Sequence, residues 1–272
     1  MRDSTNRNRP VAMTIAGSDS GGGAGIQADL KTFHQFGVYG ASAITAVTAQ
    51  NTLGVTAIHV VPVDVLEAQI LAVVSDLIPA SVKTGMLPTA EHVGAVADMA
   101  REGLLPQLIV DPVMVATSGD RLLEPGAEGA MIGLIRHAAL VTPNRVEAEI
   151  LLGRSLDETE DMESAARGLV EMGAAAALVK GGHTRGDEDR TLTDVLFDGQ
   201  SVHRFVHVRH ETVHTHGTGC TLSAAVAAGL GLGYPLVEAT GAAIRFVTDA
   251  IASAPGLGTG HGPVDHFAPV TG

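Results

Sequence analysis

Two residue types with strong chemistry are scarce in this chain. Among its 272 residues there is one cysteine, Cys220, and there are three lysines, Lys31, Lys83 and Lys180. A single cysteine excludes an internal disulfide framework and fits a reducing compartment, so we expect a cytoplasmic protein. With so few lysines, a bound phosphate must be held mainly by backbone N–H groups, by metal ions or by one well-placed side chain.

Tryptophan is absent and aromatic residues make up only 3% of the chain, whereas hydrophobic residues make up 45%. The core must therefore be built from Ala, Val, Leu and Ile. The length fits one α/β domain with a large core. Residues 1–10 are polar and contain no apolar stretch typical of a signal peptide. We expect a frayed tail over residues 1–10 and a single domain over residues 11–272.

Positive charge is also scarce, because 17 Lys and Arg residues face 30 Asp and Glu residues and the formal net charge is -13. A protein with this balance repels polyanions, so nucleic acids and anionic membranes are not expected partners. The long uncharged run 215–237 is interrupted by glycines and a proline. It is therefore interpreted as a buried helix followed by a turn and not as a membrane span.

Short apolar runs alternate with helical patterns along the chain, which predicts a mostly parallel sheet covered by helices on both faces. The expected strands are 11–16, 41–48, 81–84, 108–110, 139–142 and 176–180. The expected helices are 25–36, 63–77, 89–101, 128–137, 145–152, 162–172, 220–230 and 236–252. Two strand-like runs, 194–197 and 202–208, have no helix between them and predict a hairpin at one edge of the sheet. The charged segment 184–190 is expected to be a mobile loop.

The sequence HGTGC at 216–220 precedes a run of small and apolar residues that suits a tightly packed helix. Because Gly217 and Gly219 lack side chains, the backbone can approach an anion closely. The N–H groups of the first turn and the helix dipole would then stabilise negative charge. An ordinary Gly-rich turn that packs against the sheet explains the same residues equally well.

Charged side chains follow three of the expected strands, at the edge where parallel sheets gather their ligands. Lys180 ends an apolar strand, and its ammonium could bridge phosphate oxygens. Asn144 and Glu147 lie three residues apart at a helix start, where they could hold a hydrated Mg²⁺. The same spacing makes an N-cap with a capping box, which we favour from spacing alone. Asp111 could add negative charge nearby, or its Asp-Pro pair could simply form a turn.

Two common nucleotide motifs are missing. No G-x-G-x-x-G register fits residues 17–25, and the dipeptide GK occurs nowhere, so neither a dinucleotide fingerprint nor a P-loop is present. The loop at 17–25 instead offers close backbone approach to a small ligand, and Asp29 follows one turn into the next helix. Asp29 could equally be a solvated helix residue. Histidines crowd residues 203–216, but without a second cysteine or an HExxH helix they are interpreted as surface and loop residues.

Several segments together resemble the ribokinase-like superfamily, and within it the hydroxymethylpyrimidine and phosphomethylpyrimidine kinases of thiamine biosynthesis. They are AGSDSGGGAGIQADLKTF, AVTAQNTLGV, VKTGML, VDPVM, SGDRLL, TPNRVEAEILLG, LVKGGH and HGTGCTLSAAVAAGL. The resemblance implies a ribokinase-like three-layer α/β/α sandwich. It also implies that ATP, with Mg²⁺, phosphorylates 4-amino-5-hydroxymethyl-2-methylpyrimidine and then its monophosphate. We expect a small-molecule pyrimidine substrate and a homodimer, and a pyridoxal or pyridoxine kinase is the alternative.

The resemblance also assigns roles to individual residues. The pyrimidine would be surrounded by Gly17, Asp29, Gln50, Met86, Val113 and Cys220. Catalysis would fall to Cys220, Lys180, Gly217, Thr218 and Gly219, nucleotide binding to Lys180, Asn144, Thr218 and Gly182, and metal binding to Glu147 and Asp111. Gln50 fits physically, because its amide offers a donor and an acceptor side by side, although it could instead satisfy buried backbone groups.

Cys220 stands where sugar kinases of the superfamily usually carry an aspartate base. A thiol at a helix N-terminus is expected to have a lowered pKa, so that it could accept the hydroxyl proton. Alternatively it only positions the acceptor, because loose phosphoryl-transfer transition states need little help from a base.

Overall fold

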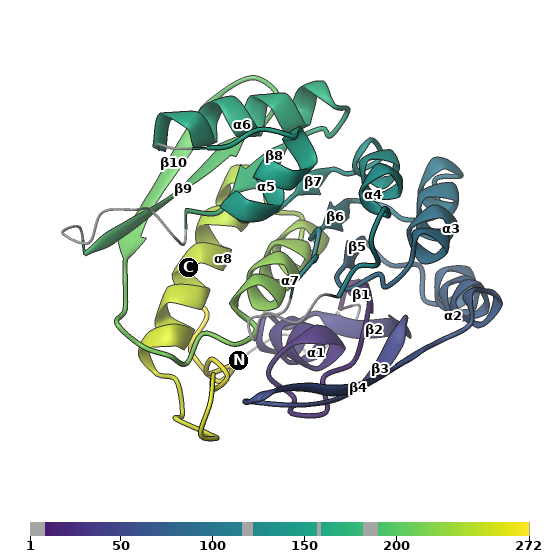
Figure 1. Ribbon diagram of the computed structural model, residues 1–272, viewed down its shortest axis with the longest axis horizontal. Coiled ribbons are helices and arrows are strands. Elements are labelled where there is room, and N and C mark those ends of the chain that lie inside the picture. The colour runs from purple at the N-terminus through teal and green to yellow at the C-terminus, as the bar shows by residue number, and fades with distance from the viewer. Residues whose placement is uncertain (1–8, 116–121, 157–158, 182–189, 272) are drawn as a thin grey trace, which may run out of the picture.

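The computed structural model describes residues 9–115, 122–156, 159–181 and 190–271. At its centre is an eight-stranded sheet with the order β10-β9-β8-β7-β6-β5-β1-β2 (Figure 1). The strands are β1 Val11–Ala16, β2 Tyr39–Ile44, β5 Ser81–Thr84, β6 Leu108–Val110, β7 Leu140–Val141, β8 Ala177–Val179, β9 Thr191–Phe197 and β10 Val202–Val208. Neighbours from β2 to β8 pair in parallel, whereas β9 is antiparallel to both β8 and β10. The predicted edge hairpin is therefore confirmed.

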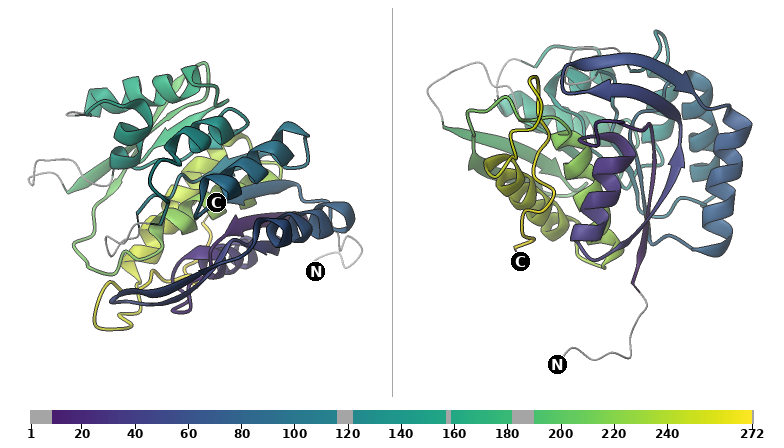
Figure 2. Two further views of the ribbon diagram at one scale, coloured as in Figure 1. Left: turned by 45° about the vertical axis from the view of Figure 1, so that its right-hand side comes forward. Right: turned by 90° about the horizontal axis from the view of Figure 1, so that it is seen from below.

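Helices cover both faces of this sheet (Figure 2). One face packs against α2 Val63–Asp76, α3 Ala90–Arg101, α4 Glu128–Ile135, α5 Arg145–Leu152 and α6 Thr159–Glu171, and the other against α1 Gly25–Gln35, α7 Thr218–Gly231 and α8 Leu236–Ala252. The strands supply both cores because successive side chains point to opposite faces. Met13 and Ile15 join the first core and Ala12 the second. The predicted three-layer α/β/α sandwich is confirmed.

Helix α7 shows why its sequence consists mainly of small residues. Every residue from Thr221 to Gly229 is buried, and the helix packs against both α1 and α8. Alanine and glycine allow this close approach, since a Cβ on Gly229 would lie 2.8 Å from the Cβ of Ala239 in α8. Within the described ranges, each helix is too short or too polar to span a bilayer.

The predicted strand 41–48 is wrong in its extent. Strand β2 ends at Ile44, and β3 Ala46–Asn51 leaves the main sheet. It pairs antiparallel with β4 Gly54–Val60, a strand that was not predicted from the sequence. The chain turns at Thr45, whose N–H donates to the carbonyl of Ala16 and whose carbonyl accepts from Val61. A continuous run of apolar and β-branched residues does not reveal such a turn. Of the expected tail and mobile loop, residues 1–8 and 182–189 lie outside the described ranges.

The strand order also locates a ligand-binding edge. From β1 the chain passes to β2 on one side, and it later returns to β5 on the other side of β1. In doubly wound sheets, ligands bind beyond the carboxyl ends of the strands at such a reversal. The loops that follow β1 and β5 therefore lie where a substrate is expected.

Candidate active site

The first turn of α7 lies against a partly buried ion pair that comes from two strand ends. Lys180 follows β8, and its Nζ donates to Oδ1 of Asp111 at 3.2 Å. Asp111 follows β6, is 2% exposed, and also accepts hydrogen bonds from the hydroxyls of Thr142 and Ser223. A Cβ placed on Gly219 would lie 3.4 Å from Nζ of Lys180 and 3.8 Å from Oδ2 of Asp111. The structure thus brings together three residues that the sequence analysis singled out separately.

Helix α7 begins without a capping side chain. Its N-cap, Gly217, has a φ of 83° and makes no side-chain cap, so the backbone N–H groups of the first turn lack the partner that a cap would supply. A side chain at Gly217 is impossible, because its Cβ would overlap the carbonyl of Gly23. Packing alone therefore explains Gly217. At Gly219 the nearest side chains are charged ones, which favours the anion-binding interpretation there.

The capping box expected at the start of α5 is present. Oδ1 of Asn144 accepts from the N–H of Glu147 at 2.9 Å, and Oε2 of Glu147 accepts from the N–H of Asn144 at 2.8 Å. The backbone of Asn144 also forms a parallel bridge with Lys180, so this helix start lies beside the charged cluster. Burial raises the pKa of Glu147 to about 7, even though Lys180 acts in the opposite direction. Glu147 is consequently both a cap and a neighbour of Lys180 and Asp111.

The charges of this cluster suit phosphate and magnesium. Burial lowers the pKa of Lys180, but Asp111 and Glu147 raise it more, so the ammonium stays charged. The carboxylates offer the hard oxygen ligands that Mg²⁺ prefers. In the part of the chain that the structure describes, no group of three or more His, Cys, Asp or Glu side chains could hold a metal. A magnesium ion at Asp111 and Glu147 would therefore take its remaining ligands from water and phosphate oxygens.

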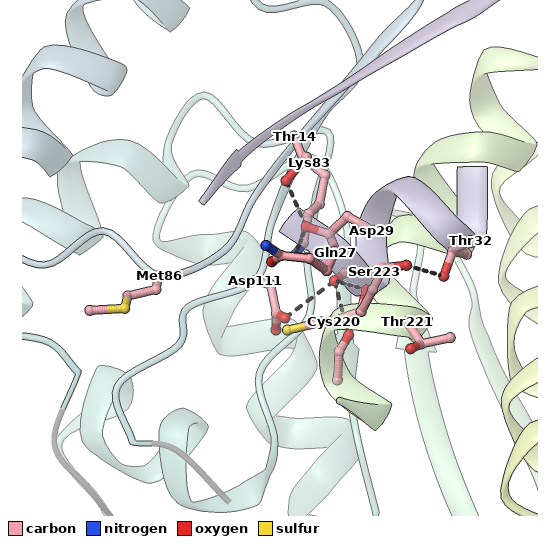
Figure 3. Close-up of polar contacts among 12 residues, drawn as sticks. Thr14, Gln27, Asp29, Thr32, Lys83, Met86, Asp111, Cys220, Thr221 and Ser223 are labelled. Carbon is pink, nitrogen blue, oxygen red and sulfur yellow. Dashed lines mark hydrogen bonds and ion pairs between the residues drawn. The ribbon is translucent and has the colours of Figure 1, made fainter. Parts of the chain in front are cut away.

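A second ion pair is completely buried. Nζ of Lys83, in β5, lies 2.9 Å from both carboxylate oxygens of Asp29, in α1, and both side chains are 0% exposed (Figure 3). The hydroxyl of Thr14 donates to the same carboxylate at 2.6 Å. Burial lowers the pKa of Lys83, but the Asp29 carboxylate outweighs it and raises that pKa. Asp29 is thus not the solvated helix residue considered as the alternative.

Cys220 lies in the first turn of α7 and is half-buried. Burial raises its pKa to about 11, and Asp29 and Asp111 add to this effect. Lys83 and the backbone N–H of Gly25 act in the opposite direction but do not offset the loss of hydration. The predicted lowering of this pKa is wrong, because the helix terminus is not the dominant influence on the sulfur. Near neutral pH, Cys220 is a protonated thiol.

Of the residues predicted to surround the pyrimidine, three follow strands of the main sheet, and Gln50 lies in the separate two-stranded sheet. Gly17 follows β1 and Met86 follows β5, and a Cβ on Gly17 would lie 3.0 Å from Sδ of Met86. Gln50 is in β3 next to an irregularity in pairing, and its backbone N–H and carbonyl both bond to the hydroxyl of Ser20. Val113 is half-buried just beyond the end of β6. In Figure 3, Met86 lies apart from the polar cluster of Asp29, Lys83 and Asp111. Gly182 lies outside the described residues.

Two pairs of interacting side chains at this edge could not be predicted from the sequence. Lys83 had a usable signal, since it is one of only three lysines and lies one residue before the end of a strand, but its partner Asp29 is 54 residues away. Asp19 and His216, which are 197 residues apart, are joined by a 2.8 Å hydrogen bond. No local spacing could have revealed that bond.

Comparison with known proteins agrees with this geometry. A family model described as phosphomethylpyrimidine kinase matches residues 19–265. The hydroxymethylpyrimidine/phosphomethylpyrimidine kinase of Rhizobium meliloti is 53% identical over 262 residues, which cover 94% of this chain and 97% of that protein. The crystal structure of a phosphomethylpyrimidine kinase from Clostridium difficile 630 is 39% identical, with a TM-score of 0.79 and coverage of 89% of this chain and 100% of that one.

The structure of the pyridoxal kinase from Staphylococcus aureus in complex with pyridoxal is also similar. It is 36% identical, with a TM-score of 0.87, and the match covers 96% of this chain and 94% of that one. The predictions of a ribokinase-like fold and of a phosphotransferase are confirmed. By sequence and by fold, the chain belongs to the phosphomethylpyrimidine kinase family.

Proposed function

We propose that this protein transfers the terminal phosphoryl group of ATP to 4-amino-5-hydroxymethyl-2-methylpyrimidine, and then phosphorylates the monophosphate, in thiamine biosynthesis. The observation that carries the proposal is the position of the Lys180 ammonium, bonded to Asp111 and next to Gly219 in the first turn of α7. A fixed cation and backbone N–H groups then act on the same transferring group. Catalysis of phosphoryl transfer consists largely of such positioning and electrostatic stabilisation.

On the nucleotide side, Lys180 and the turn from Gly217 through Thr218 and Gly219 would hold the transferring phosphoryl. Asn144, bridged to Lys180, and Gly182 would contact the nucleotide. Glu147 and Asp111 would hold Mg²⁺, which supplies neutralisation of phosphate charge when it is bound. This assignment is supported by the 3.2 Å separation of Lys180 and Asp111. Both residues also lie close enough to Glu147 to shift its pKa, which Lys180 lowers and Asp111 raises.

On the acceptor side, the protonated thiol of Cys220 would position the hydroxymethyl group and would not remove its proton as a thiolate. A loose transition state needs little base assistance, so this role is sufficient. Gln50 would bind the aminopyrimidine through hydrogen bonds, and Gly17, Met86 and Val113 would line the ring. Asp29 is completely buried and bonded to Lys83 and Thr14, so it would support the pocket from behind and would not contact the pyrimidine. The two buried hydrogen bonds from Lys83 fix the Asp29 carboxylate and thereby the first turns of α1 beside the pocket.

A pyridoxal kinase is the second candidate, because the similarity to pyridoxal kinases extends over nearly the whole chain. The purified protein should be incubated with ATP and Mg²⁺ and with either the aminopyrimidine alcohol or pyridoxal, and alcohol, monophosphate and diphosphate should be separated over time. We expect the pyrimidine monophosphate first and then the diphosphate. Phosphorylation of pyridoxal alone would favour the second candidate, and a failure to form diphosphate would remove the second step.

We also propose a cytoplasmic homodimer whose residues 11–272 form one domain. The dimer is supported by apolar side chains that are exposed on β4 and on or next to α2, namely Ile58 at 41%, Leu71 at 48% and Ile78 at 76%. A contiguous apolar surface formed by these side chains would be covered by the second copy in the proposed dimer. The mass of the protein in solution, measured by light scattering, tests the dimer, and Leu71→Glu is expected to shift it to monomer. A monomeric parent protein would contradict it.

A further inference from the structure

One buried carboxylate connects two loops at the active-site edge. Asp19, in the loop after β1, is 1% exposed. Its Oδ1 accepts from the N–H of Gly21 at 2.8 Å, and its Oδ2 accepts from the N–H of Gly23 at 3.0 Å and of Ala24 at 2.8 Å. The same Oδ2 lies 2.8 Å from Nε2 of His216. Burial raises the pKa of Asp19, but these donors together outweigh it and lower that pKa, so the carboxylate is charged.

This carboxylate lies between the N-termini of two helices. Ala24 is the N-cap of α1, and Gly217, next to His216, is the N-cap of α7, and neither helix has a side-chain cap of its own. Helix N-termini carry partial positive charge and therefore repel each other when they are close. Asp19 supplies the negative charge that offsets this repulsion. The packing of Gly217 on the carbonyl of Gly23 shows that the two helix starts are in contact.

The same two helix starts meet at Cys220. The backbone N–H of Gly25, the first residue of α1, lies close enough to the sulfur of Cys220, in the first turn of α7, to act against the rise in the pKa of that thiol. A shift of one helix start relative to the other would therefore move the thiol relative to the loop after β1. His216 itself is held in place from outside both helices, because its N–H donates to Gly262 at 3.1 Å and its backbone bridges to Pro263.

We propose that Asp19 and His216 are positioning residues, whose hydrogen bond fixes the acceptor side of the site relative to the phosphoryl-binding turn of α7. This inference rests on the proposed function. Loss of the bond lowers turnover, because small displacements of reacting groups are costly in rate. It leaves the affinity for ADP unchanged, because ADP lacks the transferring phosphoryl that the turn of α7 holds. Asp111, Asn144 and Lys180 are held by β6, α5 and β8 and not by this bond.

The test compares His216→Ala with His216→Gln, since the Gln amide can donate a hydrogen bond from near the position of Nε2. For His216→Ala, kcat is expected to fall by on the order of tenfold to 100-fold, with the dissociation constant of ADP, measured by calorimetry, within about twofold of the parent value. His216→Gln is expected to recover most of the turnover. Asp19→Asn combined with His216→Ala is expected to be no slower than the slower single variant, because both remove one bond.

A matched control lies in the edge hairpin. Nε2 of His203 bonds to Oδ2 of Asp198 at the same distance of 2.8 Å, at the turn between β9 and β10. His203→Ala is expected to leave kcat unchanged. Equal losses in His216→Ala and His216→Gln, additive losses in the double variant, or a lower melting temperature with unchanged kcat would each overturn the inference.

A measurement without substrate separates this inference from the proposed function. If the parent protein phosphorylates neither alcohol, the proposed function fails, but the rate at which iodoacetamide alkylates Cys220 still reports the geometry of the two helix starts. His216→Ala is expected to change that rate and His216→Gln to restore it. Identical rates in the parent and in His216→Ala would overturn the inference. If His216→Ala does not fold, His216→Asn replaces it, because its shorter side chain does not reach Asp19.

Discussion

Alkylation of Cys220 across a range of pH measures the electrostatics of the site directly, because only the thiolate reacts. An unperturbed thiol has a pKa of 9.0, whereas burial raises the pKa of Cys220 to about 11. Below the pKa, each unit changes the thiolate fraction about tenfold. At pH 8 the folded protein is therefore expected to react roughly 100 times more slowly than the unfolded chain, before any effect of access is counted.

The assay is the rate of iodoacetamide labelling, followed by mass spectrometry, in the native protein and in denaturant. Cys220 is the only cysteine, so every label reports on it. In the native protein the rate is expected to rise about tenfold for each pH unit, with no plateau below about pH 10. Access to the thiol scales all native rates alike and leaves the midpoint unchanged. A plateau near pH 8 would refute the reasoning, since it would mean that Lys83 and the N-terminus of α7 stabilise the thiolate more than burial destabilises it.

Three further predictions concern single side chains. Lys180→Ala is expected to lower kcat by about 100-fold or more with a smaller change in KM, because a cation on the transferring group acts mainly in the transition state; steady-state kinetics would contradict this if turnover were retained. Glu147→Gln keeps the acceptor of the capping box but removes the charge, so a metal role predicts a raised Mg²⁺ requirement at unchanged melting temperature. A change in stability alone would instead assign Glu147 to the cap. Burial lowers the pKa of His266 from 6.5 to about 4, so the unfolded chain binds more protons between these values. Stability is then complete above about pH 6.5 and falls by about 3 kcal/mol as the pH drops to 4; urea unfolding of the parent and of His266→Gln should show a smaller acid loss in the variant, and equal losses would contradict the assignment.

Much of the nucleotide side could be predicted from the sequence. Asp111, Lys180 and the HGTGC turn follow apolar strands or precede a packed helix, and parallel strands bring their carboxyl ends to one edge. Their meeting therefore follows from local patterns together with one topological rule. The capping box of Asn144 and Glu147 is likewise local, because it depends on a three-residue spacing.

The division of the run 41–48 into β2 and β3 could not be predicted in the same way. Both parts are rich in residues that favour strands, and what separates them is the bond from Thr45 to Ala16 of another strand. Strand preference depends strongly on what the side chains pack against, and that is not a local property.

The sequence by itself determined the kind of sheet, the helix starts and the edge at which the charged residues collect, because these depend on periodicity and short spacings. The tertiary structure alone decided the pairing of Asp29 with Lys83 and of Asp19 with His216. It also decided the raised pKa of Cys220. The physical reason is the same in each case: the partner of a buried charge, and the water that it loses, depend on residues from distant parts of the chain.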